Sequence, residues 1–158
     1  MIYLDKNGIT IKASKEAVVG EEYELNGEKY KVVDEEMLRE MVKNEEDVTK
    51  VVTSRVTNMA EMSFSESFNQ NIGSWDVSEV TDMFRLFLDA KKFHQDISNW
   101  NVSKVENMRG MFAGANSFNQ DISNWDVSNV RNMIGTFAKA NSFNQDISSW
   151  DVSKVEDM

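Results

Sequence analysis

The sequence predicts an α/β protein: a right-handed solenoid in which each coil contributes one strand to a parallel sheet and one short helix. The main observation is internal repetition, because variants of FNQDISNWDVSNV begin at Phe68, Phe93, Phe118 and Phe143, each 25 residues after the last. A repeat period of 20–50 residues is typical of stacked architectures. The second observation is a switch of apolar period within each unit, and the third is the absence of the repeat from residues 1–47.

The strand and the helix are predicted from that switch of period. Segment 124–128, NWDVS, alternates polar and apolar residues, which indicates a short half-buried strand. The next apolar residues fall at i, i+3 and i+7, the spacing of one helix face, and they are Val130, Met133 and Phe137. Ser128 stands at the N-cap position between the two, and Gly114 in the preceding unit is placed to end a helix.

The repeated apolar residues form columns that we expect to point into a shared core. One unit cannot bury enough apolar surface alone, so each unit has to pack against the next. The tryptophan column has the same phase as the neighbouring valine column, which favours packing inside rather than exposure. The columns are Phe68, Phe93, Phe118, Phe143; Ile72, Ile97, Ile122, Ile147; Trp75, Trp100, Trp125, Trp150; and Val77, Val102, Val127, Val152.

The pattern divides the chain into an N-terminal capping element, residues 1–47, and a solenoid of about four and a half repeats, residues 48–158. In the first part, Asn26-Gly27 lies between two alternating runs, which predicts a β-hairpin. Residues 9–13 predict another strand, and residues 34–42 predict a helix with Asp34 as its N-cap. Such an element would cover the open edge of the first coil. An independent binding module is the alternative.

Composition excludes several classes of function. The formal net charge is −10, so binding to nucleic acid is not expected, because phosphate groups would be repelled. No apolar run approaches the ~20 residues of a membrane span, so membrane insertion is not expected either. The chain has no cysteine, a single histidine at position 94, and no serine-elbow, phosphate-loop or zinc motif. The notable residues are all periodic, whereas active sites are asymmetric. We therefore expect no enzyme activity, no cofactor and no metal.

Three kinds of column are candidate sites. Exposed tryptophans could stack on sugar rings, although their phase favours the core. Stacked carboxylates could bind calcium, but asparagine interrupts both columns and turn hydrogen bonds explain the residues equally well. The two columns are Asp96, Asp121, Asp146 and Asp76, Asp126, Asp151. The ladder of Asn69, Asn119 and Asn144, joined by His94, is expected to bind loop amides.

The residues also carry a family resemblance. Ile122, Trp125 and Val127 occupy apolar positions that look like a leucine-rich-repeat core. The longer string FNQDISNWDVSNVxNMxxMF resembles the 25–26-residue repeat of BspA-like bacterial surface proteins and lipoproteins. The resemblance covers about residues 48–158 and implies a leucine-rich-repeat-like fold. It also implies display on the cell surface or secretion, although this chain carries no export signal of its own, and adhesion to a host or neighbouring-cell protein or matrix.

From these observations we expect a non-enzymatic scaffold that binds another macromolecule through the polar side of the predicted strands. The outward positions are Ser74, Asp76, Asn99, Asn101, Asn124, Asp126, Ser149 and Asp151. The alternatives are a carbohydrate-binding module that uses the tryptophan or Asn/Asp ladders, and a purely structural spacer. The last unit stops at Met158, inside its predicted helix. We expect its uncovered apolar side to fray or to allow end-to-end self-association.

Overall fold

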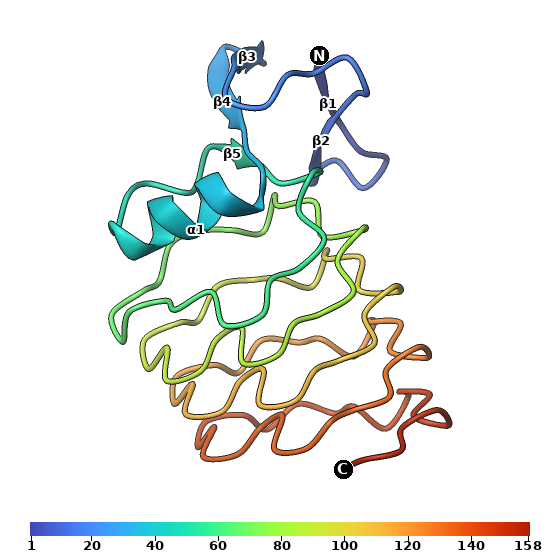
Figure 1. The fold of residues 1–158 in the computed structure, drawn as a ribbon. Helices are drawn as coiled ribbons and strands as arrows, with labels where there is room; N and C mark the ends of the chain where they lie inside the picture. The colour runs from blue at the N-terminus through green and yellow to red at the C-terminus, as the bar shows by residue number, and fades with distance from the viewer.

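The computed structural model describes residues 1–158 and contains two small sheets, one helix and a stack of turn-rich layers (Figure 1). Strands β1 (Ile2–Leu4) and β2 (Ile11–Ala13) form an antiparallel pair. Strands β3 (Glu22–Leu25), β4 (Glu28–Val32) and β5 (Val51–Val52) form the second sheet, in which β4 and β5 are parallel. Helix α1 spans Glu35–Lys43. It lacks the length and the apolar character that a membrane crossing requires.

The N-terminal predictions on the hairpin and the helix are confirmed. Asn26 and Gly27 have φ values of 54° and 82°, as a tight turn between β3 and β4 requires. Asp34 caps α1 by accepting a hydrogen bond from the Met37 N–H at 2.9 Å. Leu38 and Val42 on the inner side of α1 are buried. The sequence therefore specifies these local elements through turn and cap residues.

Helix α1 and strand β5 connect the N-terminal elements to the repeats. The Arg39 guanidinium on α1 donates to the carbonyls of Ala60, at 2.8 Å, and Asn58, at 3.3 Å, both in the first layer. Strand β5 lies beyond residue 47 but pairs with β4, with Val32 opposite Val52. The capping elements and the repeats therefore share a sheet as well as a core.

Residues 53–158 fold into layers that lie one above another, each made by one repeat (Figure 1). Isolated parallel bridges link the layers at one position per repeat. The bridged residues are Asn58, Asp82, Asn107, Asn132 and Asp157. Aromatic rings stack from layer to layer as well, and the Trp75 and Trp100 rings lie 6.3 Å apart with an interplanar angle of 6°. Each layer thus holds the next through backbone bonds and ring contacts.

The tryptophans lie in the core, as their phase predicts. Trp75, Trp100 and Trp125 are 0%, 3% and 4% exposed. Each indole Nε1–H also donates to a carbonyl of the preceding layer, as Trp100 does to Ile72 at 3.1 Å. The inward columns hold through the inner layers, but the last layer is only half-buried at Trp150 because no layer follows it. A tryptophan platform for sugars is therefore incompatible with the structure at the three inner positions.

The predicted fold class is wrong. A leucine-rich-repeat-like α/β solenoid requires a strand and a short helix in each coil, but residues 53–158 contain only turns, irregular segments and isolated bridges. The single helix, α1, and both sheets belong to residues 2–52. The prediction of a leucine-rich-repeat solenoid with a continuous parallel sheet is wrong for the same reason.

The missing helices have a backbone cause. A helix requires each N–H to bond four residues back, whereas Gly110, Phe112 and Gly114 donate to the next layer. Their acceptors are the carbonyls of Ile134, Thr136 and Ala138, at 2.8–2.9 Å. Gly110 and Gly114 also have positive φ values, 61° and 73°, which a right-handed helix excludes. Gly114 is therefore a turn residue and does not end a helix.

Candidate partner-binding face

The eight predicted face residues lie in four successive layers, in the segments 74–76, 99–101, 124–126 and 149–151. Their exposure differs from layer to layer. Asn101, Asn124, Asp126, Ser149 and Asp151 are exposed, whereas Ser74 and Asn99 are half-buried. Asp76 is only 5% exposed. Identical positions in the repeat therefore have different access to a partner.

One column of the face is built from Asx turns. In each, the side-chain Oδ1 accepts a hydrogen bond from the backbone N–H of the serine two residues later. The pairs are Asp76–Ser78, Asn101–Ser103, Asp126–Ser128 and Asp151–Ser153, all at 3.0–3.1 Å. In the first three the serine hydroxyl also donates to Oδ1, at 2.6 Å. The turn explanation for this column is confirmed.

These turns affect the charge of the face. The Ser128 hydroxyl, followed by the Ser128 backbone N–H, lowers the pKa of Asp126. Hydrogen bonding by Ser153 lowers the pKa of Asp151 as well. Both carboxylates are therefore ionised at neutral pH. Each retains a second oxygen, Oδ2, that accepts no hydrogen bond.

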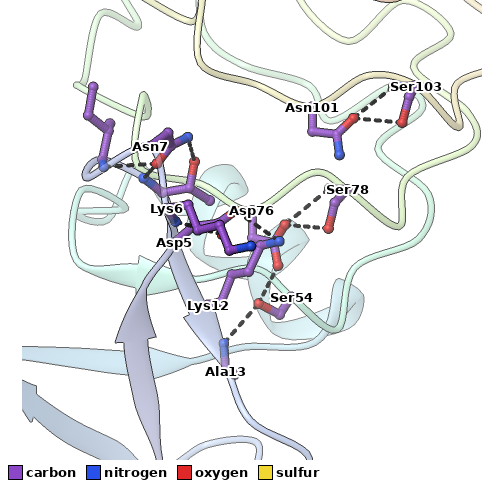
Figure 2. Close-up of polar contacts among 12 residues, drawn as sticks. Asp5, Lys6, Asn7, Lys12, Ala13, Ser54, Asp76, Ser78, Asn101 and Ser103 are labelled. Carbon is purple, nitrogen blue, oxygen red and sulfur yellow. Dashed lines mark hydrogen bonds and ion pairs between the residues drawn. The ribbon is translucent and has the colours of Figure 1, made fainter.

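The first copy of the face is covered by the hairpin of β1 and β2, as Figure 2 shows. Ser54 Oγ donates to Asp76 Oδ2 at 2.6 Å and itself accepts from the Ala13 N–H of β2 at 3.0 Å. The Ile11 N–H of the same strand donates to the Ser74 carbonyl at 2.9 Å. Both oxygens of Asp76 are thus occupied. The accessible part of the face begins one layer later, at Asn101.

Two other face residues take part in the stacking. Asn124 Nδ2 donates to the Ser98 carbonyl and Ser149 Oγ to the Ser123 carbonyl, both at 3.0 Å. The Asn99 amide has no such bond and lines a groove instead. The column of Asn101, Asp126 and Asp151 therefore keeps the most freedom to contact a partner.

The asparagine ladder has the role that its sequence predicts, although its residues are not buried. Asn69 Oδ1 accepts from the His94 N–H at 2.9 Å, and Asn119 Oδ1 accepts from the Asn144 N–H at 2.8 Å. The Gln145 amide adds a bond to the Asn119 carbonyl at 3.0 Å. These side chains therefore tie one layer to the next.

The second carboxylate column also consists of turn residues. Asp96, Asp121 and Asp146 each accept from the N–H of the serine two residues later, at 2.9–3.0 Å. No group of three or more His, Asp or Glu side chains is placed to hold a metal ion.

A groove between the capping elements and the repeats was missed by sequence reasoning. Its volume is about 460 Å³, and Ile9 and Tyr30 in its wall come from outside the repeats, so no periodic signal could reveal it. Neither the Tyr30 hydroxyl nor the Asn99 amide in its wall has a hydrogen-bond partner. Lys50, also in the wall, is paired with Glu28. The lining residues are Ile9, Tyr30, Thr49, Lys50, Asn71, Gly73, Ser74, Asp96 and Asn99.

The layered core and the recurring Asx turns define the class: a repeat protein whose identical units stack through side-chain columns. More particularly, the chain belongs to the family described as "Mycoplasma protein of unknown function, DUF285". Two matches to that family cover residues 33–133 and 96–158. Together they begin just after β4 and include α1, β5 and all the layers. No curated protein and no solved structure matches the chain.

Proposed function

We propose that this protein is a non-enzymatic scaffold that binds another protein through the exposed polar side of its layers. The observation that carries the proposal is one position that stays exposed in three successive layers, at Asn101, Asp126 and Asp151. The Oδ1 atom of each is held by a serine N–H, so the remaining polar atom has a fixed direction. Side chains that are already ordered lose less entropy when a partner binds.

Charge and repetition indicate the kind of partner. Asp126 and Asp151 are ionised, and Asn101 offers an amide beside them, so a complementary surface would carry basic groups or amide donors at regular spacing. Contacts that are weak singly add up when several form together. An extended protein, such as a host or matrix protein or a protein on a neighbouring cell, can provide such a series.

The family resemblance supports the biological setting of this proposal. The repeat beginning at Phe118 resembles that of BspA-like bacterial surface proteins, for which adhesion is the expectation. We therefore propose cell-surface display or secretion for the protein, with adhesion as the purpose of the face.

Binding to immobilised fibronectin, laminin and collagen, measured by biolayer interferometry, tests the proposal. The variant Asp126→Asn/Asp151→Asn removes two charges but keeps both Asx turns, since Asn101 makes the same turn in the native protein. We expect at least one matrix protein to bind the parent and the variant to bind about tenfold or more weakly. The matched control, Glu22→Gln/Glu24→Gln on β3, removes two exposed charges away from the face. Equal binding by parent and variant would exclude the face, and no binding by the parent would exclude matrix adhesion.

A saccharide site is the second candidate, and the groove beside the first layers favours it. Sugar hydroxyls both donate and accept hydrogen bonds, which suits the unpaired Asn99 amide and Tyr30 hydroxyl. Asp96 adds a carboxylate with one free oxygen, and the Tyr30 ring and Ile9 add apolar surface. A glycan array with the parent and with Asn99→Leu tests this function. Asn124→Leu, one layer on and outside the groove, is the control. A parent that binds no glycan would eliminate this candidate.

A further inference from the structure

The dipeptide that forms the turn between β3 and β4 occurs twice in the chain, as Asn7-Gly8 and as Asn26-Gly27. Both asparagines are exposed. Both glycines have positive φ values, 72° and 82°, and nothing lies within 4 Å of the position that a Cβ would take. The two sites therefore share the same following residue, the same backbone region at the glycine and the same open surroundings.

Hydrogen bonds distinguish the two sites, and Asn7 is the one that is held (Figure 2). Asn7 Oδ1 accepts from the N–H groups of Ile9 and Thr10, both at 2.9 Å. Asn7 Nδ2 donates to Thr10 Oγ1 at 2.8 Å. The Gly8 N–H donates to the Asp5 carbonyl at 2.9 Å. The side-chain amide of Asn7 and the peptide nitrogen that follows it are thus both fixed by partners.

Asn26 has none of these bonds. Its side-chain amide makes no hydrogen bond, and the Gly27 N–H has no acceptor, because the β3–β4 ladder ends at Leu25 and Glu28. The turn lies at the exposed tip of the hairpin. Short exposed turns open locally at a low free-energy cost. The Asn26 side chain and the Gly27 nitrogen can therefore approach each other without breaking a hydrogen bond.

We propose that Asn26 is a site of covalent modification by intramolecular deamidation, and that Asn7 is protected from the same reaction. The Gly27 backbone nitrogen loses its proton and attacks the carbonyl carbon of the Asn26 side chain. The bond from that carbon to the amide nitrogen breaks, ammonia leaves, and a cyclic succinimide forms. Water then hydrolyses the ring. Opening at the side-chain carbon gives aspartate, and opening at the backbone carbon gives isoaspartate.

The two products have different effects on the capping element. Asp-Gly favours the same turn as Asn-Gly, so aspartate adds one negative charge and keeps the hairpin. Isoaspartate adds a backbone carbon to a two-residue loop, which alters the fit between Leu25 and Glu28. Strand β4 also carries Tyr30 in the wall of the groove and pairs with β5. The modified turn is therefore part of the strand that joins the capping elements to the repeats.

Peptide mapping of protein kept at neutral pH in water labelled with heavy oxygen tests the proposal, because hydrolysis of the succinimide places the label in the product. Trypsin separates the two sites into the peptides 7–12 and 16–29. In the folded protein, Asn26 should convert about tenfold or more faster than Asn7, because Asn7 reacts only after its hydrogen bonds break. An isoaspartyl methyltransferase should methylate peptide 16–29.

Unfolding provides the control for this comparison. In urea the two rates should become similar, since both sites then react as the same unstructured dipeptide. Conversion of Asn26 in the folded protein no faster than that of Asn7, or only in urea, would overturn the proposal. A difference of the same size in urea would show that the hydrogen bonds do not cause it.

A single substitution tests the protection of Asn7. Thr10→Val keeps the shape of the side chain but removes the oxygen that holds Asn7 Nδ2. The rate at Asn7 should rise about two- to tenfold, as expected for the loss of one hydrogen bond, and the rate at Asn26 should not change. Thr81→Val, the same change at an exposed threonine in the layers, should alter neither rate. An unchanged rate at Asn7, or an equal rise at both sites, would contradict the assigned protection.

Discussion

Trp125 and Trp150 occupy the same position in adjacent repeats, so replacing each by alanine measures the contribution of the layer that follows. Trp125 is 4% exposed and donates from Nε1 to the Ile97 carbonyl at 3.2 Å. It has ring neighbours in its own layer and in the next, Phe112 at 6.2 Å and Trp150 at 6.5 Å. Trp150 donates in the same way, to Ile122 at 3.1 Å, but no layer lies beyond it.

The expected magnitudes follow from this difference in burial. Trp125→Ala removes a fully packed ring and a buried hydrogen bond, which should lower the free energy of unfolding by about 3–5 kcal/mol. For a domain of this size the loss corresponds to a melting temperature about 6–20 °C lower. Trp150→Ala leaves a space already open to water, so the loss should be roughly half of that or less.

Urea and thermal unfolding followed by circular dichroism, at concentrations where the protein is monomeric, give both values. Equal losses for the two variants would refute the reasoning, because they would show that the following layer adds nothing to the tryptophan contacts. A larger loss for Trp150→Ala would contradict the order of the layers.

Three further predictions follow from single contacts. Gly73→Ala should lower the free energy of unfolding by about 1–3 kcal/mol, because a Cβ would lie 2.7 Å from the Asp96 carbonyl oxygen. Serine occupies this position in the other repeats. Urea unfolding measures the change. Arg39→Met should cost about 1.5–3 kcal/mol by the same measurement, because it removes a charged donor that holds α1 to Ala60. Acid should destabilise the protein as the pH falls through the lowered pKa of Asp126, since the stability that a group with a depressed folded pKa contributes is fully present above its unfolded pKa, near 3.8, and is lost as the pH falls through the folded pKa. Asp126→Asn should reduce this acid sensitivity in unfolding midpoints compared between pH 5 and pH 3, and an unchanged dependence would exclude the group as a cause.

Local signals in the sequence were sufficient for the hairpin of β3 and β4 and for α1, whereas β1 and β5 were not predicted. Asn-Gly at residues 26–27 requires two positive φ values that these residues adopt at low cost, and Asp34 provides the capping oxygen that α1 needs. The inward columns were also predictable, because the strict 25-residue register brings each residue against its own copy. Trp75, Trp100 and Trp125 follow that rule.

The absence of a helix from each repeat could not be predicted from the sequence. The spacing of Val130, Met133 and Phe137 fits a helix face, but the same three residues also point inward from a chain of turns. The choice depends on where alternate N–H groups find acceptors, and these lie about 24 residues away in the next layer. Positive φ values at Arg85 and Asp89, which are not glycines, show how far the stacking overrides local preference.

The candidate face shows a similar limit. Asp76 and Asp126 have the same neighbours in sequence, and both form the same turn with the following serine. Only Asp76 is covered, because β2 folds back from residues 11–13 to reach it through Ser54. That contact spans more than 40 residues, and the repeat carries no trace of it.

Repetition by itself therefore specifies the core, and function has to come from places where the copies stop being equivalent. The β1–β2 hairpin covers Asp76 and so removes it from the face, whereas the equivalent residues of the next three repeats are exposed. A ligand that recognised every copy equally would meet no such differences. The covering of the first layer thus gives a direction to a stack whose units are nearly identical, and it leaves Asn101, Asp126 and Asp151 as the exposed copies.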